Sequence, residues 1–317
     1  MKTYLEDLKN ALLKMQLSED KINEILSDME EMIASAKEEG ISDDDIKLKF
    51  GNPEKLAREL AEIEPKVSQP VDETDQDTTY VFEPTSEKLS VHTKFFSDDV
   101  TYRQVDSDKI RVVLKNKKDS QKYHVSYQDH VLKIEPEHKV QTFFGFSFGH
   151  SSHEIYVEIP KGTKIDEFKH QVVNGDTVVE GLFIDKLNLN TTEGDLNIDS
   201  INVNDCQIHT VNGDIKFLNS HAKIMHISTV SGDIEAFGTV VESDLTINTV
   251  SGDFEAKESE AHTFYFHAVS GDASGREFYI KRLSFDSISG DCSIKNDRKE
   301  HIEIIRQKTL SGDIHIS

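Results

Sequence analysis

The chain has 317 residues, 36% of them hydrophobic, and a formal net charge of −23. Its length allows two or three domains, and its acidity disfavours binding to the phosphate backbone of nucleic acids. No apolar run reaches the roughly 20 residues that span a bilayer, and acidic residues follow Met1 where a secretory signal would be apolar. We therefore expect a cytoplasmic or peripherally membrane-associated protein, with a cell-surface location by a non-classical route as the alternative.

Residues 1–64 carry the pattern of a small four-helix module. Apolar side chains recur at helical spacing in two runs, the first from Leu5 to Leu12 and the second from Ile22 to Ala36. We expect a signalling or adaptor module that docks a protein partner. The candidate docking residues, for which a place in the core of the bundle is the favoured alternative, are Leu8, Leu12, Met29 and Met32.

Two short helices are expected at the end of this module. Ser42, followed by three aspartates, is typical of a helix N-terminus, and Gly51 is typical of the end of that helix. Asn52 and Pro53 then have the residue types of an N-cap and a first helical position.

A linker and a β region follow the helices. Residues 65–79 contain two prolines, few apolar residues and an excess of acids, which is typical of a mobile linker. From residue 80 to 165, short alternating runs such as 110–114 and 154–160 predict strands without a repeat. We expect this region to lead into and cap the repeats that come after it.

The most unusual local segment of the β region is rich in phenylalanine, glycine and serine. Buried, it would form a lid on the first coil of the repeats; exposed, it would be a contact loop for a membrane interface or an apolar peptide. The aromatic residues of this segment are Phe143, Phe144, Phe146 and Phe148.

Residues 166–317 contain eight Gly-Asp dipeptides at intervals of 19 to 22 residues. Such a period is typical of a solenoid with one coil per repeat, in which each coil buries its apolar face against its neighbours. The residues assigned to the corners of these coils are Gly175, Asp176, Gly194, Asp195, Gly213, Asp214, Gly232, Asp233, Gly252, Asp253, Gly271, Asp272, Gly290, Asp291, Gly312 and Asp313. The predicted fold is therefore mainly β: a right-handed β-helix, or β-solenoid, of about eight coils of 19–20 residues, preceded by a β lead-in and the helical module.

No motif in the chain indicates catalysis, a cofactor or a metal. Stacked corner aspartates would suit a ladder of cations, yet calcium-binding solenoids place several glycines in every nine residues, and this chain has one Gly-Asp per coil. Cys206 and Cys292 are expected to be reduced, buried thiols. Glu235 and Glu255, at equivalent places on adjacent coils, are where a carbohydrate-active β-helix enzyme would be sought. We predict a protein that is not an enzyme.

Two sequence segments resemble known families. Residues 157–162 and the successive Val-Ser-Gly-Asp corners resemble a bacterial adhesin-like β-strand-repeat family of unknown function, over residues 80–317. Residues 51–60 resemble the α-helical domain found beside histidine kinases and PadR-type regulators in Firmicutes. Together the two parts are similar to Lia-type envelope-stress proteins, although that family often has a transmembrane helix where this chain has its acidic linker.

This resemblance implies a binding and scaffold protein of bacterial envelope-stress signalling. The helical module would dock a protein partner, and the solenoid would be an adhesin-like binding surface with no nucleic-acid partner. One alternative is a surface-exposed adhesin or a binder of cationic antimicrobial peptides, to which the acidic surface would be attractive. A remote alternative is a carbohydrate-active β-helix enzyme.

Overall fold

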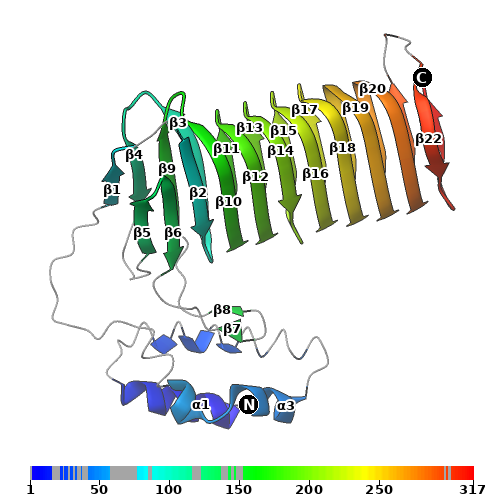
Figure 1. The fold of residues 1–317 in the computed structure, drawn as a ribbon. Coiled ribbons are helices and arrows are strands. Elements are labelled where there is room, and N and C mark those ends of the chain that lie inside the picture. Colours follow the sequence, from blue (N-terminus) through cyan, green and yellow to red (C-terminus); the bar gives the residue numbers. More distant parts are fainter. Residues whose placement is uncertain are drawn as a thin grey trace. The chain divides into compact units, whose positions relative to one another are not determined.

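The structure is a computed structural model of the chain, shown in Figure 1. It describes residues 2–15, 22–23, 25–27, 29–30, 33, 37, 42–57, 77–84, 88–115, 123–136, 142–143, 146–147, 153–295, 298 and 301–317. The chain forms two compact units. One comprises Met1–Gln76, Lys117–Tyr123 and Pro136–Ser151, and the other comprises Asp77–Asn116, His124–Glu135 and Ser152–Ser317.

The N-terminal unit is helical. Helix α1 spans Lys2–Leu13 and helix α3 spans Asp43–Phe50, and the described positions between residues 22 and 37 are helical too. Their apolar faces form one core. Its buried members are Tyr4, Leu8, Ala11, Leu12, Ile22, Ile25, Met29, Ile33, Ile46, Phe50, Leu56 and Ala57.

Three of the candidate docking residues lie in the core, which was the favoured alternative for them. Leu8, Leu12 and Met29 have no exposed surface, because the helices turn these side chains toward one another. Met32 lies outside the described residues. The predicted caps are confirmed: Gly51 follows α3 with a φ of +71°, and Asn52 Oδ1 accepts the backbone N–H groups of Glu54 at 2.8 Å and Lys55 at 3.2 Å.

The second unit is a β-solenoid, which confirms the predicted fold class. Each coil has a long strand and a short strand, which are joined at a Gly-Asp corner in every described coil after the one formed by β2 and β3. The long strands are β2 (Lys88–Lys94), β10 (Lys164–Asn174), β12 (Phe183–Glu193), β14 (Asn202–His209), β16 (His221–Ser231) and β18 (Val240–Ser251). The short strands are β3 (Asp98–Val105), β11 (Thr177–Glu180), β13 (Leu196–Asp199), β15 (Ile215–Leu218) and β17 (Ile234–Phe237).

Later coils follow the same plan with fused strands. Both β19 (Phe254–Ser270) and β20 (Ala273–Ser289) combine a short strand with the next long strand. The described coils are completed by β21 (Cys292–Lys295), β22 (Glu303–Lys308) and β23 (Ile314–Ile316). Every strand pairs in parallel with its equivalent one coil away, so that equivalent residues stack along the rod seen in Figure 1.

Alternating side chains fill the interior of the solenoid. In β12 and β13, Leu187, Leu189, Leu196 and Ile198 point inward and are buried, while the residues between them face outward. Toward the C-terminal coils the aliphatic stack is replaced by aromatic rings in mutual contact. These rings belong to Phe254, Phe264, Phe266, Phe278 and Phe285. The core is thus continuous from coil to coil, as stacking requires.

A second corner follows the short strand in the coils from β11 to β20, and one residue there takes the left-handed conformation. Its φ lies between +47° and +68°, yet glycine occupies only two of the six positions. These positions are Gly181, Ser200, Asn219, Gly238, Glu258 and Glu277.

Strands outside the Gly-Asp repeats cover the N-terminal end of the stack. The strands of this cap are β1 (Thr78–Phe82), β4 (Ile110–Leu114), β5 (Tyr123–Gln128), β6 (Val131–Pro136) and β9 (His153–Pro160). Strand β9 lies parallel to β3, and β4 and β1 continue the sheet in antiparallel order. Glu158 on β9 is mostly buried and pairs with Arg103 at 2.7 Å and Arg111 at 3.1 Å, so it ties the cap to the first coil.

A buried polar cluster lies inside the first two coils. His170 Nδ1 lies 2.9 Å from the Tyr102 hydroxyl and 3.0 Å from Thr93 Oγ1, and His170 Nε2 lies 2.9 Å from Thr177 Oγ1. All four side chains are almost completely buried. Burial lowers the pKa of His170 to about 3 and raises that of Tyr102 well above its usual value. His170 is therefore neutral in the folded protein.

This cluster predicts a pH-dependent stability. The unfolded chain binds a proton at His170 below pH ~6.5, but the folded protein does not, so stability should fall as pH drops from there toward 3. The loss approaches about 1.4 kcal/mol per pH unit, the full value of one proton. Urea denaturation of the wild type and of His170→Gln, whose amide does not titrate, should give free energies that converge on acidification. Curves that stay parallel between pH 6 and pH 4 would contradict this assignment.

Candidate binding ridge at the Gly-Asp corners

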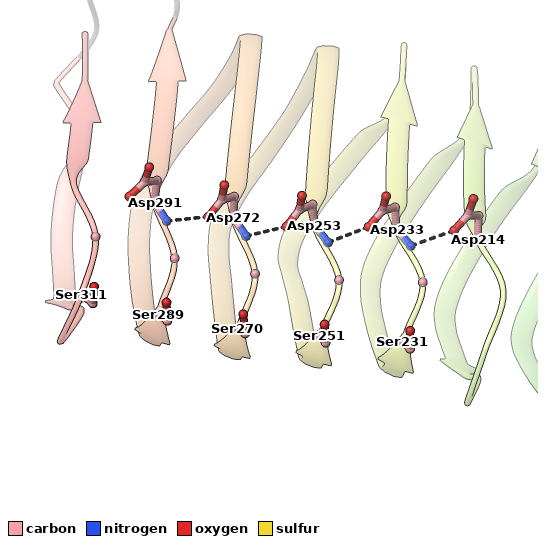
Figure 2. Close-up of a pocket in the computed structure, with 15 residues that line it drawn as sticks. Asp214, Ser231, Asp233, Ser251, Asp253, Ser270, Asp272, Ser289, Asp291 and Ser311 are labelled. Atoms are coloured by element: carbon pink, nitrogen blue, oxygen red, sulfur yellow. Dashed lines mark hydrogen bonds between the residues drawn. The ribbon is translucent and has the colours of Figure 1, made fainter. Parts of the chain in front are cut away.

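A continuous ladder of hydrogen bonds links the corner aspartates. The backbone N–H of each aspartate donates to Oδ1 of the aspartate one coil earlier, at 2.7 to 2.9 Å. Figure 2 shows the part of this ladder from Asp214 to Asp291. Oδ1 of each accepting carboxylate thus has a backbone N–H as a fixed donor, which offsets the repulsion between the stacked acids. In the cation-ladder hypothesis, a metal ion would offset this repulsion.

Glycine is required at the corners because successive coils touch there through their backbones. A Cβ atom on Gly213 would lie 2.1 Å from the carbonyl oxygen of Gly194, and one on Gly271 would lie 2.3 Å from that of Gly252. Gly213 also has a φ of +120°, which disfavours other residues. The contact is the more general cause, since at Gly271 it acts without a left-handed backbone.

The ladder begins one coil before the first Gly-Asp dipeptide. Asp99 Oδ1 accepts the N–H of Asp176, and Asp98 takes the place of the corner glycine, with its carbonyl beneath Gly175. Strand β3 already includes Asp98, which pairs with His153 of β9. The segment Ser97-Asp98-Asp99 keeps the serine and the aspartate of the repeat, and this is the signal that a search for Gly-Asp passes over.

Buried threonines shape the corner from the inside. Thr210 Oγ1 donates to the carbonyl of Asn212 at 3.2 Å, and Thr191 and Thr229 make equivalent bonds at 3.1 Å and 3.3 Å. Each bond joins the threonine to the carbonyl two residues later, and the residue that directly follows the threonine points outward. The outward residue is apolar in nearly every coil.

Three parallel rows of side chains result, and together we call them the corner ridge. The apolar row, between 36% and 75% exposed, is Val173, Val211, Val230, Val250, Val269, Ile288 and Leu310. The hydroxyl row is Ser231, Ser251, Ser270, Ser289 and Ser311, and the acidic row is the aspartate ladder. In Figure 2 the serines and the aspartates run side by side along the coils.

An open groove of about 720 Å³ follows the ridge. It is lined by serine, glycine and aspartate residues of the corners between Asp214 and Gly312. The described lining contains no histidine, cysteine or lysine, so these residues present hydroxyl groups and carboxylate oxygens without a neighbouring base or thiol. Such a surface can accept hydrogen bonds from cationic groups. Across the described part of the chain, no three His, Cys, Asp or Glu side chains gather as metal ligands would.

In the sequence, the phenylalanine segment falls between β6 and β9. Phe143 in β7 (Thr142–Phe143) pairs with Phe146 in β8 (Phe146–Ser147) in antiparallel fashion. Phe144 and Phe148 lie outside the described residues. Whether the segment is a lid or a contact loop remains a prediction.

The remaining candidates have structural surroundings. Cys206 and Cys292 are buried free thiols, and burial raises the pKa of each to about 12, so neither is a reactive thiolate. Glu235 and Glu255 are neighbours on adjacent strands, as expected. Each carboxylate has a lysine partner, at 3.9 Å for Glu235 and 2.8 Å for Glu255.

Comparison with known families identifies the solenoid. The family model Toastrack DUF4097 matches residues 86–272 and 241–317, which is most of the chain. The chain belongs to the Toastrack DUF4097 family. A second family model, HAAS, matches residues 3–59, the helical unit. No curated protein matches the chain. Among the described residues, the Toastrack protein has no helix long and apolar enough to cross a membrane.

Several solved structures are similar to the Toastrack solenoid. A proposed lipid-binding protein from Parabacteroides distasonis is 15% identical, with a TM-score of 0.46, over 76% of this chain and 97% of its own. A proposed adhesin from Bacteroides fragilis is 19% identical, with a TM-score of 0.45, over 71% of this chain and 98% of its own.

The corner contact predicts unequal effects of two glycine substitutions. Gly271→Ala adds a methyl group against a backbone carbonyl and should cost about 3 kcal/mol or more, as overpacking does. Gly162 has a φ of +85° but open space where a Cβ would lie, so Gly162→Ala should lower the free energy of unfolding by only about 1 kcal/mol. Thermal unfolding followed by circular dichroism compares the two variants. Equal losses would show that backbone conformation, and not contact between coils, selects glycine at the corners.

Proposed function

We propose that this Toastrack protein is a non-enzymatic binding and scaffold protein of bacterial envelope-stress signalling. Its helical unit docks a protein partner, and its solenoid supplies an adhesin-like binding surface. The observation that carries the proposal is the corner ridge, in which apolar, hydroxyl and acidic side chains repeat in parallel along a rigid stack. A soluble protein seldom exposes a continuous apolar row unless a partner covers it.

The ridge suits a long, regular partner surface. Five consecutive members of the apolar row, from Val230 to Leu310, are each more than two-fifths exposed. They stack at the strand spacing of about 4.8 Å. A partner that lies along the rod would bury all of them at once, and the adjacent aspartates would meet its polar or cationic groups.

Docking by the helical unit must use its exposed residues, because the apolar faces of the helices are buried in the core. Leu13 at the end of α1 is half exposed and is the large apolar side chain that the described helices leave at the surface. It therefore replaces Leu8, Leu12 and Met29 as the docking candidate.

The cytoplasmic or peripherally membrane-associated location belongs to this proposal. Protease treatment of intact cells, followed by immunoblotting of both halves of the chain, tests it. Survival of both halves until lysis fits the adaptor role. Cleavage of the solenoid in intact cells would move the protein to the cell surface and favour the second candidate function below.

Deletion of residues 1–64 tests the adaptor role. The solenoid has a core of its own, so the truncated chain should keep its strand signal in circular dichroism while the envelope-stress response is lost. Leu13→Asp in the full chain should weaken signalling without unfolding the bundle, since Leu13 is outside the core. Full signalling by both variants would contradict partner docking through the helices.

The second candidate function is binding of cationic amphipathic peptides at a cell surface. The observation in its favour is the apolar row beside the aspartate row, on a chain of net charge −23. Apolar and cationic faces of such a peptide would meet the two rows together.

A pair of matched double variants tests this second candidate. Val250→Asp with Val269→Asp should weaken binding of a fluorescent cationic amphipathic peptide by about tenfold or more, because two apolar contacts are lost. Leu218→Asp with Phe237→Asp changes the same charge at similarly exposed apolar residues away from the ridge, and should leave binding unchanged. Fluorescence anisotropy measures both. Equal affinities would mean that net charge alone attracts the peptide.

A further inference from the structure

A second surface of the solenoid differs from the ridge in its charge. It is the outer face of the long strands at the capped end, where β6, β2, β10, β12 and β14 lie in parallel register, as Figure 1 shows. An open pocket of about 580 Å³ lies on this face. The pocket belongs to neither the corner ridge nor the helical unit, and we call it the lysine–amide pocket.

Stacking places the pocket residues in two neighbouring rows. One row runs through Lys133, His92, Lys169 and Asn188, which pair with one another from strand to strand. The other row lies two residues further along each strand. Its members are Glu135, Lys94, Gln171, Asn190 and His209.

Cations gather at one end of these rows, on a chain that is strongly acidic overall. Lys133 pairs with Glu135 at 2.7 Å, and Lys169 pairs with Glu167 at 2.7 Å. The pKa of Glu167 lies below its usual value, chiefly because of the hydrogen bond with Lys169. These pairs hold two lysines in place, and no ion pair of the described residues involves Lys94. Within the described part of the chain, Lys94 is thus a cation without an acidic partner, in a pocket that also contains Lys133 and Lys169.

Amide side chains occupy the other end of the pocket. Asn190 donates to Asn188 Oδ1, which orients both amides. Asn190 Oδ1 and the second Nδ2 hydrogen then remain for a ligand, and Gln171 next to it adds a further donor and acceptor. Amides that offer both donors and acceptors suit hydroxyl groups, and lysine suits phosphate as a point charge.

We propose that the lysine–amide pocket binds a phosphorylated polyol, with the phosphate at Lys94 and the hydroxyl groups at Asn190 and Gln171. The ligand class is that of glycerol phosphate, whether it is free, part of a polymer or the headgroup of a lipid. Neither the ridge nor the helical docking surface is needed for this binding, so the proposal goes beyond the proposed function.

Binding of small probes to the full chain tests the pocket. Isothermal titration calorimetry with glycerol 1-phosphate should show binding at millimolar concentrations, inorganic phosphate should bind more weakly, and glycerol should not bind. Lys94→Gln should weaken binding of both phosphates by about tenfold, the usual effect of losing a hydrogen bond to a charged group. Lys281→Gln, an exposed lysine on the distant strand β20, removes the same charge and should have no effect.

A second substitution separates phosphate recognition from hydroxyl recognition. Asn190→Ala should lower the affinity for glycerol 1-phosphate to that for inorganic phosphate and leave the latter unchanged. Both pocket residues are on the surface, so thermal unfolding should be nearly unaffected and will verify that the variants are folded. Absence of glycerol 1-phosphate binding, or equal losses in Lys94→Gln and Lys281→Gln, would overturn the proposal.

Vesicles distinguish the sources of the ligand. Sedimentation with phosphatidylglycerol vesicles, but not with phosphatidylcholine vesicles, that depends on Lys94 would assign the pocket to a lipid headgroup. Binding of free glycerol 1-phosphate without vesicle binding would assign it to a soluble or polymeric polyol phosphate. The double variant Val250→Asp with Val269→Asp should retain glycerol 1-phosphate binding, so failure of the ridge hypothesis and failure of this one are separable.

Discussion

Contact between the backbones of successive corners is the constraint on which the rest of the solenoid depends. Where one corner glycine meets the carbonyl of the one before it, no side chain fits, and the neighbouring aspartate must bond to its equivalent one coil away. The corner therefore cannot accept an inserted residue, whereas other parts of the coil can. The 20-residue coil accommodates its extra residue in an irregularity of pairing between Val241 and Leu245, on the far side of the coil. The corner row continues in register through it.

The same constraint explains what the sequence revealed. From Gly194 onward, each corner glycine contacts the corner glycine of the preceding coil, so glycine recurs there in every repeat. That regular spacing predicted a β-solenoid. The second corner carries no such restriction, because Ser200, Asn219 and Glu258 adopt the left-handed conformation in place of glycine. Its period is visible only in the backbone. The Gly-Asp pattern did not predict the first coil, because Asp98 stands where the motif has glycine.

Features of the side-chain surface depend on stacking and were hidden in the sequence. His170 lies in register with Leu189 and Thr93, so a polar cluster replaces an apolar stack at one point of the core. The lysine–amide pocket likewise forms because residues up to 117 positions apart, from His92 to His209, come together. In the helical unit the apolar spacing was clear, but spacing alone does not distinguish a core stripe from a docking stripe. Leu8 illustrates this ambiguity.

The aspartate ladder also has a direction. The backbone N–H of each corner aspartate points to the preceding coil, and the carboxylate of that preceding aspartate offers its Oδ1 as the acceptor. Each coil thus provides the acceptor for the aspartate N–H of the next coil, and its own aspartate N–H uses an acceptor that the preceding coil already provides. A duplicated coil would find its acceptor already in place and would present the same acceptor to the next. Rod length is consequently a quantity that evolution can change by whole coils, which would lengthen the corner ridge while the capped end and its pocket stay the same.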